Sequence, residues 1–212
     1  MEILYLKEVD QLTRFECHAH TMYSNIRLLD CINTPQGLVD RALELGLAGV
    51  CCTDHEALGA HVAFDKLREY AKEKDENFKI GLGNEIYLVD ERISNQRYWH
   101  FILIAKDFIG YKALRELSSI AWQNSYFDRG MERVPTLKSD IEYIINKYGK
   151  GHLIGSSACL GSELDNAILE MDKAERLDNL QGKTEHYHRI INLVECLFFN
   201  SSAIPESINV IE

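Results

Sequence analysis

The chain has 212 residues and a formal net charge of −10, with 46% hydrophobic and 26% charged residues. This length suits a single domain over 1–212 and is short for two. A protein this acidic is not expected to hold duplex DNA tightly by itself, because basic side chains supply most of that affinity. It can still act on a phosphate ester if metal cations supply the positive charge.

Membrane and secreted classes are also disfavoured by the sequence. No apolar run approaches the roughly 20 residues that span a bilayer, and the acidic N-terminus does not resemble a secretory signal. Cys51 and Cys52 are adjacent within an apolar run, which makes a poor disulfide framework and suits a reducing compartment. We therefore expect a cytoplasmic protein without a membrane partner.

Short apolar strands alternate with helices along the chain. In chain order the predicted elements are a strand over 15–20, a helix over 35–46 capped by Asn33 or Thr34, a strand over 48–53, a helix over 58–74, strand segments over 78–82 and 85–89, a hairpin loop over 90–97, a strand over 98–105, a helix over 112–124, a charged loop over 128–134, a helix from 136 or 139 to 148, a strand over 152–157 and mainly helix to 199. This alternation predicts a parallel α/β architecture.

Residues that bind metals occur where the predicted strands end. His18 and His20 are two apart and therefore point to the same side of a strand. The other candidates are Asp54, His55, Glu85, His100 and Cys159. Imidazole, carboxylate and thiolate groups bind zinc, iron or manganese. Such groups at five strand ends indicate a multinuclear metal site.

Each candidate also has a structural interpretation when it is taken alone. A His-x-His pair is about as often structural as functional, and His100 between two aromatic residues is typical of a satisfied core histidine. Cys159 alone is typical of a small buried hydrophobe. The joint occurrence of these residues at strand ends favours the metal site.

The remaining histidines have a different pattern. His61, His186 and His188 fall in helical patterns and are expected at the surface, whereas His152 begins a strand away from the ligand-bearing ends. We leave all four out of the predicted site.

Ligands at the carboxyl ends of successive strands favour a barrel, because that face of a barrel carries its active sites. A doubly wound open sheet is the alternative. The sequence contains neither a Gly-x-Gly-x-x-Gly motif nor a Walker-type loop, which counts against the nucleotide-cofactor versions of that alternative.

Several motifs together resemble those of the polymerase and histidinol phosphatase (PHP) family. They are His18-Ala19-His20-Thr21 with Tyr23-Ser24, Thr53-Asp54-His55, Gly83-Asn84-Glu85 and His100. The resemblance is closer to the N-terminal PHP domain of the bacterial DNA polymerase III alpha subunit. That part of the resemblance rests on Leu28-Leu29-Asp30, on Leu114-Arg115-Glu116-Leu117-Ser118 and on the segment His152 to Gly161 that contains Cys159.

The resemblance implies a distorted (β/α)7 TIM-like barrel that holds up to three divalent transition metals, which are zinc, manganese or iron. The implied ligands are His18, His20, Asp30, His55, Glu85, His100 and Cys159. Asp54 is expected to orient His55 or a metal-bound water. The family pattern closes with an Asp-x-His pair that this sequence lacks after Cys159, so we expect a truncated barrel without its last strands.

The implied activity is metal-dependent phosphoester hydrolysis in DNA replication, within a parent DNA-directed DNA polymerase. Metal ions would polarise the phosphoryl oxygens and lower the pKa of a water. We assign catalytic roles to Glu85 as a bridging carboxylate, to Asp54 and to Arg133. Arg129 and Arg133 lie in the charged loop and are candidates to bind the phosphate. A salt-bridged surface loop is an equally good interpretation of these two arginines.

The expected substrate is a phosphoester or a nucleic-acid 3′ end, which includes 3′–5′ exonuclease proofreading. Expected partners are the rest of a replicative polymerase and an exonuclease subunit. The alternatives are a catalytically weak structural module of the polymerase and a standalone small-molecule phosphatase. The ligand-type residues at all seven implied positions favour retained metal binding.

Overall fold

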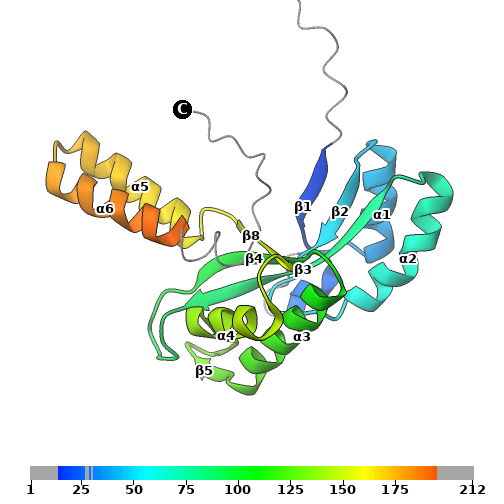
Figure 1. Ribbon diagram of the computed structural model, residues 1–212, viewed down its shortest axis with the longest axis horizontal. Helices are drawn as coiled ribbons and strands as arrows, with labels where there is room; N and C mark the ends of the chain where they lie inside the picture. The colour runs from blue at the N-terminus through cyan, green and yellow to red at the C-terminus, as the bar shows by residue number, and fades with distance from the viewer. Residues whose placement is uncertain (1–13, 27–28, 30, 195–212) are drawn as a thin grey trace, which may run out of the picture.

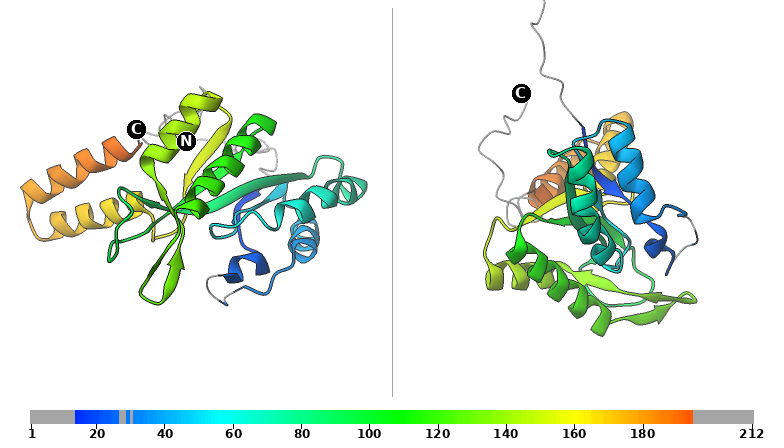
Figure 2. Two further views of the ribbon diagram at one scale, coloured as in Figure 1. Left: turned by 90° about the horizontal axis from the view of Figure 1, so that it is seen from below. Right: turned by 90° about the vertical axis from the view of Figure 1, so that its right-hand side faces the viewer.

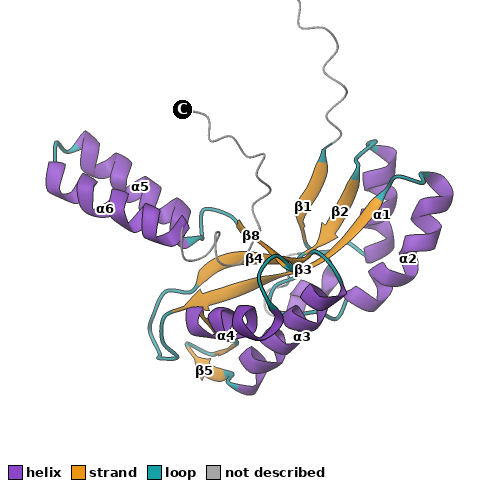
Figure 3. Cartoon of the chain, in the orientation of Figure 1, coloured by secondary structure: helices purple, strands orange, loops and turns teal. Residues whose placement is uncertain are grey.

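The computed structural model describes residues 14–26, 29 and 31–194. The strands are β1 (Phe15–Ala19), β2 (Gly49–Cys52), β3 (Lys79–Val89), β4 (Trp99–Ala105), β5 (Tyr126–Asp128), β6 (Met131–Arg133), β7 (Pro135–Leu137) and β8 (Leu153–Ser157). The helices are α1 (Pro35–Glu44), α2 (His61–Lys74), α3 (Phe108–Gln123), α4 (Lys138–Tyr148), α5 (Glu163–Arg176) and α6 (Leu180–Leu193), with a short 3-10 helix, η1 (Met22–Ile26), after β1. Figures 1 and 3 show their arrangement.

One curled sheet organises the molecule, with strand order β1-β2-β3-β4-β8 and β7 paired to the end of β3. Strands β1, β2 and β3 are parallel, but β4 is antiparallel to both β3 and β8. The sheet is therefore mixed, and the predicted parallel architecture fails at β4. The predicted loop over 90–97 does join β3 to β4 as a hairpin connection. Because the chain turns back there, the start of β4 lies at the same edge as the ends of β1 and β2.

The four helices α1 to α4 cover the same face of this sheet. Ile80 and Leu82 of β3 pack in the apolar cluster that includes residues of α1 and α2. Ile86 and Leu88, which point the same way along β3, pack with α3 and α4. A doubly wound sheet carries helices on both faces, so this packing favours a half-barrel over that alternative (Figure 2). These helices leave the opposite, concave face uncovered, so polar side chains can lie there.

Capping side chains set where α1 and α3 begin. Thr34 Oγ1 accepts the backbone N–H of Gly37 at 3.0 Å, and Pro35 occupies the first turn of α1, as predicted. Helix α3 begins at Phe108, earlier than the predicted residue 112. Asp107 explains the difference, because its carboxylate accepts the backbone N–H of Gly110 at 2.8 Å.

The charged stretch over 128–134 was predicted to be a loop. It instead forms most of the small hairpin β5–β6. Arg129 and Gly130 close this hairpin with φ angles of 52° and 76°. Tight hairpin turns need positive φ at both central residues, and arginine seldom adopts that conformation. The strands are also only three residues long, so their periodicity gives little signal.

His61 is another correction to the sequence analysis. It was expected at the surface, but only 1% of the residue is exposed, and its Nε2 lies 2.8 Å from the carbonyl oxygen of Gly83. His61 is the first residue of α2, and its side chain faces β3 instead of solvent. Burial lowers the pKa of His61.

Helices α5 and α6 form an antiparallel pair that projects from the half-barrel (Figures 1 and 2). Ser162 caps α5 by accepting the backbone N–H of Asp165 at 3.0 Å. The ion pair between Arg189 and Glu163, at 2.9 Å, ties α6 to the start of α5. The predicted helical character is thus confirmed as far as residue 194. In the described part of the chain, no helix is long and apolar enough to cross a membrane.

Candidate metal centre

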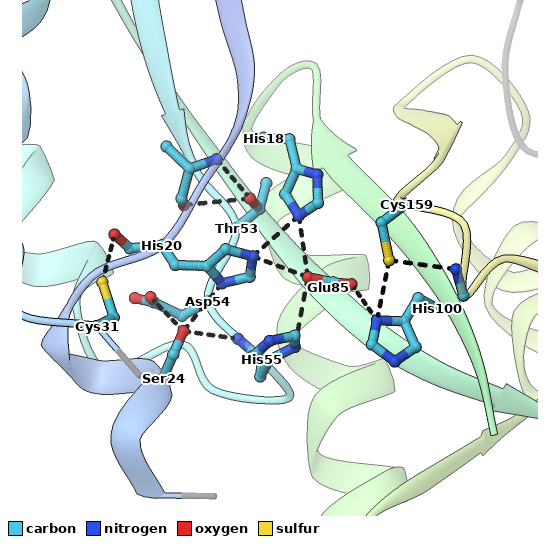
Figure 4. Close-up of polar contacts among 12 residues, drawn as sticks. His18, His20, Ser24, Cys31, Thr53, Asp54, His55, Glu85, His100 and Cys159 are labelled. Atoms are coloured by element: carbon cyan, nitrogen blue, oxygen red, sulfur yellow. Dashed lines mark hydrogen bonds and ion pairs between the residues drawn. The ribbon is translucent and has the colours of Figure 1, made fainter. Parts of the chain in front are cut away.

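Glu85 lies at the centre of a histidine cluster on the concave face of the sheet (Figure 4). Only 1% of this residue is exposed. Its Oε1 lies 2.6 Å from His100 Nδ1, and its Oε2 lies 2.9 Å from His20 Nε2, 3.0 Å from His18 Nε2 and 3.3 Å from His55 Nδ1. Four imidazoles from three separate parts of the sequence therefore face one buried carboxylate.

The topology of the sheet explains this convergence. His18 lies near the end of β1 and His20 follows that strand, while His55 follows β2 and forms an isolated parallel bridge with Glu85. His100 pairs with Tyr87 across the antiparallel β3–β4 ladder. The strand-end prediction needs correction at two positions, because Glu85 lies inside β3 and His100 lies near the beginning of β4.

The cluster divides into two groups that share Glu85. We call His18, His20 and Glu85 the β1 group, and His55, Glu85 and His100 the β2–β4 group. In each group the potential ligand atoms lie within 4.8 Å of one another. Nitrogen and carboxylate ligands at this density suit a divalent transition metal.

The arrangement of the potential ligand atoms shows whether a cation fits between them. The Nε2 atoms of His18 and His20 lie 2.9 Å apart, and both face Glu85 Oε2. A neutral imidazole carries one N–H and one lone pair, so when both rings are neutral and carry their proton on Nδ1, three lone-pair-bearing atoms meet at this point. A bound cation satisfies all three atoms together. The residues present therefore fit a metal ion.

Electrostatic coupling inside the cluster is strong. Burial by itself raises the pKa of Glu85, but hydrogen bonds from His100, His18 and His20 outweigh that effect and hold the pKa well below its usual range. The hydrogen bond to Glu85 raises the pKa of His18, although burial opposes this. In the metal-free chain the carboxylate thus stays ionised and favours a protonated imidazole beside it.

Asp54 is fully buried directly before His55. Its Oδ1 accepts the backbone N–H of Thr21 at 2.6 Å and the hydroxyl of Ser24 at 2.8 Å. Its Oδ2 accepts the hydroxyl of Thr21 at 2.7 Å and lies 3.3 Å from the thiol of Cys52. These contacts suit a supporting carboxylate, and the roles assigned to Asp54 remain predictions.

The other predicted site residues are placed less centrally. Asp30 lies outside the described residues. Cys159 follows β8 and is exposed, with its Sγ 3.7 Å from His100 Nδ1. The Arg133 guanidinium lies over the Tyr98 ring, 4.9 Å from its centroid, and Arg129 donates to Asn95 Oδ1 at 3.1 Å. The ligand role of Cys159 and the phosphate-binding role of either arginine remain predictions.

Two neighbours of the cluster had no role assigned from the sequence. Ser24 Oγ lies 3.0 Å from His20 Nδ1. Tyr87 is 8% exposed, and its ring centroid lies 4.8 Å from that of His100 and 5.6 Å from that of His55. Tyr87 is two residues after Glu85, so strand periodicity already places both on one face. Ser24 belongs to a recognised motif, but its hydroxyl contacts depend on η1.

Comparisons with known proteins identify the family of the chain. A model of the PHP domain matches residues 16–197. A DNA-directed DNA polymerase of Bacillus phage SPbeta is 42% identical over 185 residues, which cover 82% of this chain and 14% of that protein. The DNA polymerase III subunit alpha of Helicobacter pylori is 30% identical over 172 residues, which cover 79% of this chain and 13% of that protein.

Likeness among solved structures is weaker. An amidohydrolase from Chromobacterium violaceum aligns over 52% of this chain and 34% of that chain, with 18% identity and a TM-score of 0.38. We draw no argument from this alignment.

The chain spans 14% or less of the two polymerases that it matches. The α/β fold with its curled half-barrel sheet is consistent with a distorted TIM-like barrel that lacks strands, as expected from the sequence. The family model covers most of the chain, and polymerase relatives align over the same region. This chain therefore belongs to the PHP domain family.

Proposed function

We propose that this chain is the PHP domain of a longer, replicative type of DNA polymerase, and that its histidine cluster binds divalent transition metals to hydrolyse a phosphoester. The observation that carries the proposal is Glu85, a buried carboxylate with four imidazole nitrogens within 3.3 Å. The polymerase relatives support the parent context. The proposed partners are the rest of that polymerase and an exonuclease subunit, in the cytoplasm.

In this proposal the four histidines and Glu85 are the ligands of two metal ions. His18 and His20 hold one metal ion with Glu85, and His55 and His100 hold a second with the same carboxylate. When bound, such ions stabilise charge on phosphoryl oxygens and lower the pKa of water. Glu85 keeps the two ion positions together as a bridging carboxylate.

Asp30 and Cys159 complete the proposed ligand set beside these five residues. Asp54 supports the histidines, and Arg133 is a candidate for the substrate phosphate. The domain boundaries 1–212 are part of the same proposal.

The test measures metal content and hydrolysis together. We expect the chain purified without chelator to carry transition metal and to show weak, manganese-stimulated hydrolysis of an aryl phosphate or of a single-stranded DNA 3′ end. No nucleotide incorporation is expected. His55→Ala should reduce both metal content and hydrolysis, because it removes a ligand.

His152→Ala is the matched control, because His152 pairs with Asp107 instead of Glu85. Equal hydrolysis in the parent chain, His55→Ala and the control would identify a contaminating enzyme. Metal binding without any hydrolysis would favour the structural-module alternative. Efficient turnover of a small phosphate ester, with no action on DNA, would favour a small-molecule phosphatase.

A further inference from the structure

Ser24 occupies an unusual position beside the metal centre. It lies in η1, is fully buried, and its Oγ lies within hydrogen-bonding distance of three groups (Figure 4). These are Asp54 Oδ1 at 2.8 Å, His20 Nδ1 at 3.0 Å and the backbone N–H of His55 at 3.1 Å. One hydroxyl thus contacts a residue from each of the two metal-binding groups.

The chemistry of a hydroxyl determines the direction of these bonds. A serine hydroxyl can donate one hydrogen bond and accept two. The backbone N–H of His55 can only donate, so it uses one lone pair of the serine oxygen. Asp54 Oδ1 already accepts the backbone N–H of Thr21 at 2.6 Å, and an ionised carboxylate only accepts. Ser24 therefore donates its proton to Asp54.

His20 must then supply a proton to the remaining lone pair of Ser24. Its Nδ1 carries the N–H, so in the neutral ring its Nε2 carries a lone pair. That Nε2 lies 2.9 Å from Glu85 Oε2. The hydrogen-bond chain from Asp54 through Ser24 thus directs a metal-binding lone pair of His20 towards the centre of the cluster.

We propose that Ser24, anchored by Asp54, is a positioning residue that fixes His20 in its metal-binding tautomer and ties it to the start of the β2–β4 group. The inference rests on the metal-binding part of the proposed function. In this proposal Asp54 supports His20 through Ser24, whereas the sequence alone predicts that Asp54 orients His55 or a water. The chain Asp54–Ser24–His20 is the equivalent of the carboxylate partners that orient metal-binding histidines elsewhere.

Nitrogen NMR of the histidine rings tests the tautomer directly in metal-free protein, at a pH where His20 is neutral. We expect His20 to be protonated at Nδ1 in the parent chain and to lose this preference in Ser24→Ala. A neutral His20 protonated at Nε2 in the parent chain would overturn the proposal. This measurement needs neither bound metal nor catalysis, so it remains decisive even if the chain proves to be inactive.

Metal titration provides the second readout. Ser24→Ala should weaken zinc or manganese binding by about 10–100-fold, the usual effect of losing a group that orients a ligand. Ser24→Thr keeps the hydroxyl and should restore most of the affinity. Ser119→Ala, which removes an exposed hydroxyl bonded to the carbonyl of Arg115, is the matched control and should bind like the parent.

Unchanged metal affinity in a folded Ser24→Ala variant would overturn the proposal. If that variant does not fold, the tautomer of the parent chain and the affinity of Ser24→Thr still decide it. If the parent chain binds no metal while His20 shows the expected tautomer, the proposed function fails and the assignment of Ser24 stands.

Discussion

The two groups that share Glu85 are built in different ways. The β1 group takes both of its imidazoles from one short segment and faces Glu85 through Nε2 atoms. The β2–β4 group takes His55 from the end of β2 and His100 from the start of β4, and both face Glu85 through Nδ1 atoms. A local spacing creates the first group, whereas chain reversal between β3 and β4 creates the second.

This difference also appears in how the ligands are supported. His20 is held by a buried serine and a buried aspartate. His100 instead has the Tyr87 ring beside it and the exposed Cys159 at 3.7 Å. The His20 side chain thus depends on a hydrogen-bond network, while the position of His100 depends on strand register. Changes to these supports should therefore affect the two groups unequally.

The largest effect is expected from Glu85→Gln, because both groups use this carboxylate. The amide keeps the shape but removes the negative charge, so affinity for a divalent cation should fall by at least about 100-fold in both groups. Elemental analysis after gel filtration measures the loss. Glu116→Gln is the control, since Glu116 pairs with Lys147 outside the cluster. Retention of half of the metal would show that one group functions without Glu85.

The β1 group illustrates what could be predicted from the sequence. His18 and His20 lie two residues apart, and that spacing alone places both side chains on one side of a strand. The capped start of α1 was likewise predictable, because Thr34 and Pro35 act within one turn. In both cases the controlling interactions are local in the chain.

The β2–β4 group required the structure. The hairpin loop predicted over 90–97 implies that β4 runs antiparallel to β3, but only the observed register places His100 beside Glu85. Burial of His61 and the hydroxyl contacts of Ser24 also depend on long-range packing. The strand-end pattern and the family resemblance supplied the candidate ligands, but neither supplied these supporting contacts.

Double alanine substitutions, one pair in each group, provide a sharper test of the two-group description. His18→Ala/His20→Ala should empty the β1 group, and His55→Ala/His100→Ala should empty the β2–β4 group. Each variant should therefore retain about half of the metal bound by the parent chain. Loss of all metal in either variant would show that the groups bind cooperatively as one site.

Cys159→Ser should affect only the β2–β4 group and only some metals. A thiolate favours zinc over the harder manganese ion, so zinc affinity should fall by roughly 10-fold, about 1.4 kcal/mol, while manganese affinity changes little. Competition titrations with a chromogenic chelator measure both values. Equal affinities for zinc before and after the change would exclude Cys159 as a ligand.

The smallest expected effect is the pH dependence of stability in the metal-free chain. The hydrogen bond to Glu85 raises the pKa of His18. The contribution of protonated His18 to the free energy of unfolding is therefore complete below its unfolded pKa of about 6.5 and is lost as the pH rises through its folded pKa. Hydrogen bonds from His100, His18 and His20, opposed by burial, lower the pKa of Glu85. The contribution of ionised Glu85 to the free energy of unfolding is present above its unfolded pKa of about 4.5 and is lost on acidification towards its folded pKa.

His18 and Glu85 should therefore contribute most to the stability of the metal-free protein between about pH 4.5 and 6.5, and this contribution should fall towards pH 8. Bound metal reverses that trend, because imidazole must lose its proton to bind. Melting curves across this range, with chelator and with added zinc or manganese, should separate progressively as the pH rises. Parallel curves would mean that the cluster titrates without binding metal, and both groups would then be hydrogen-bonded histidines around a buried carboxylate.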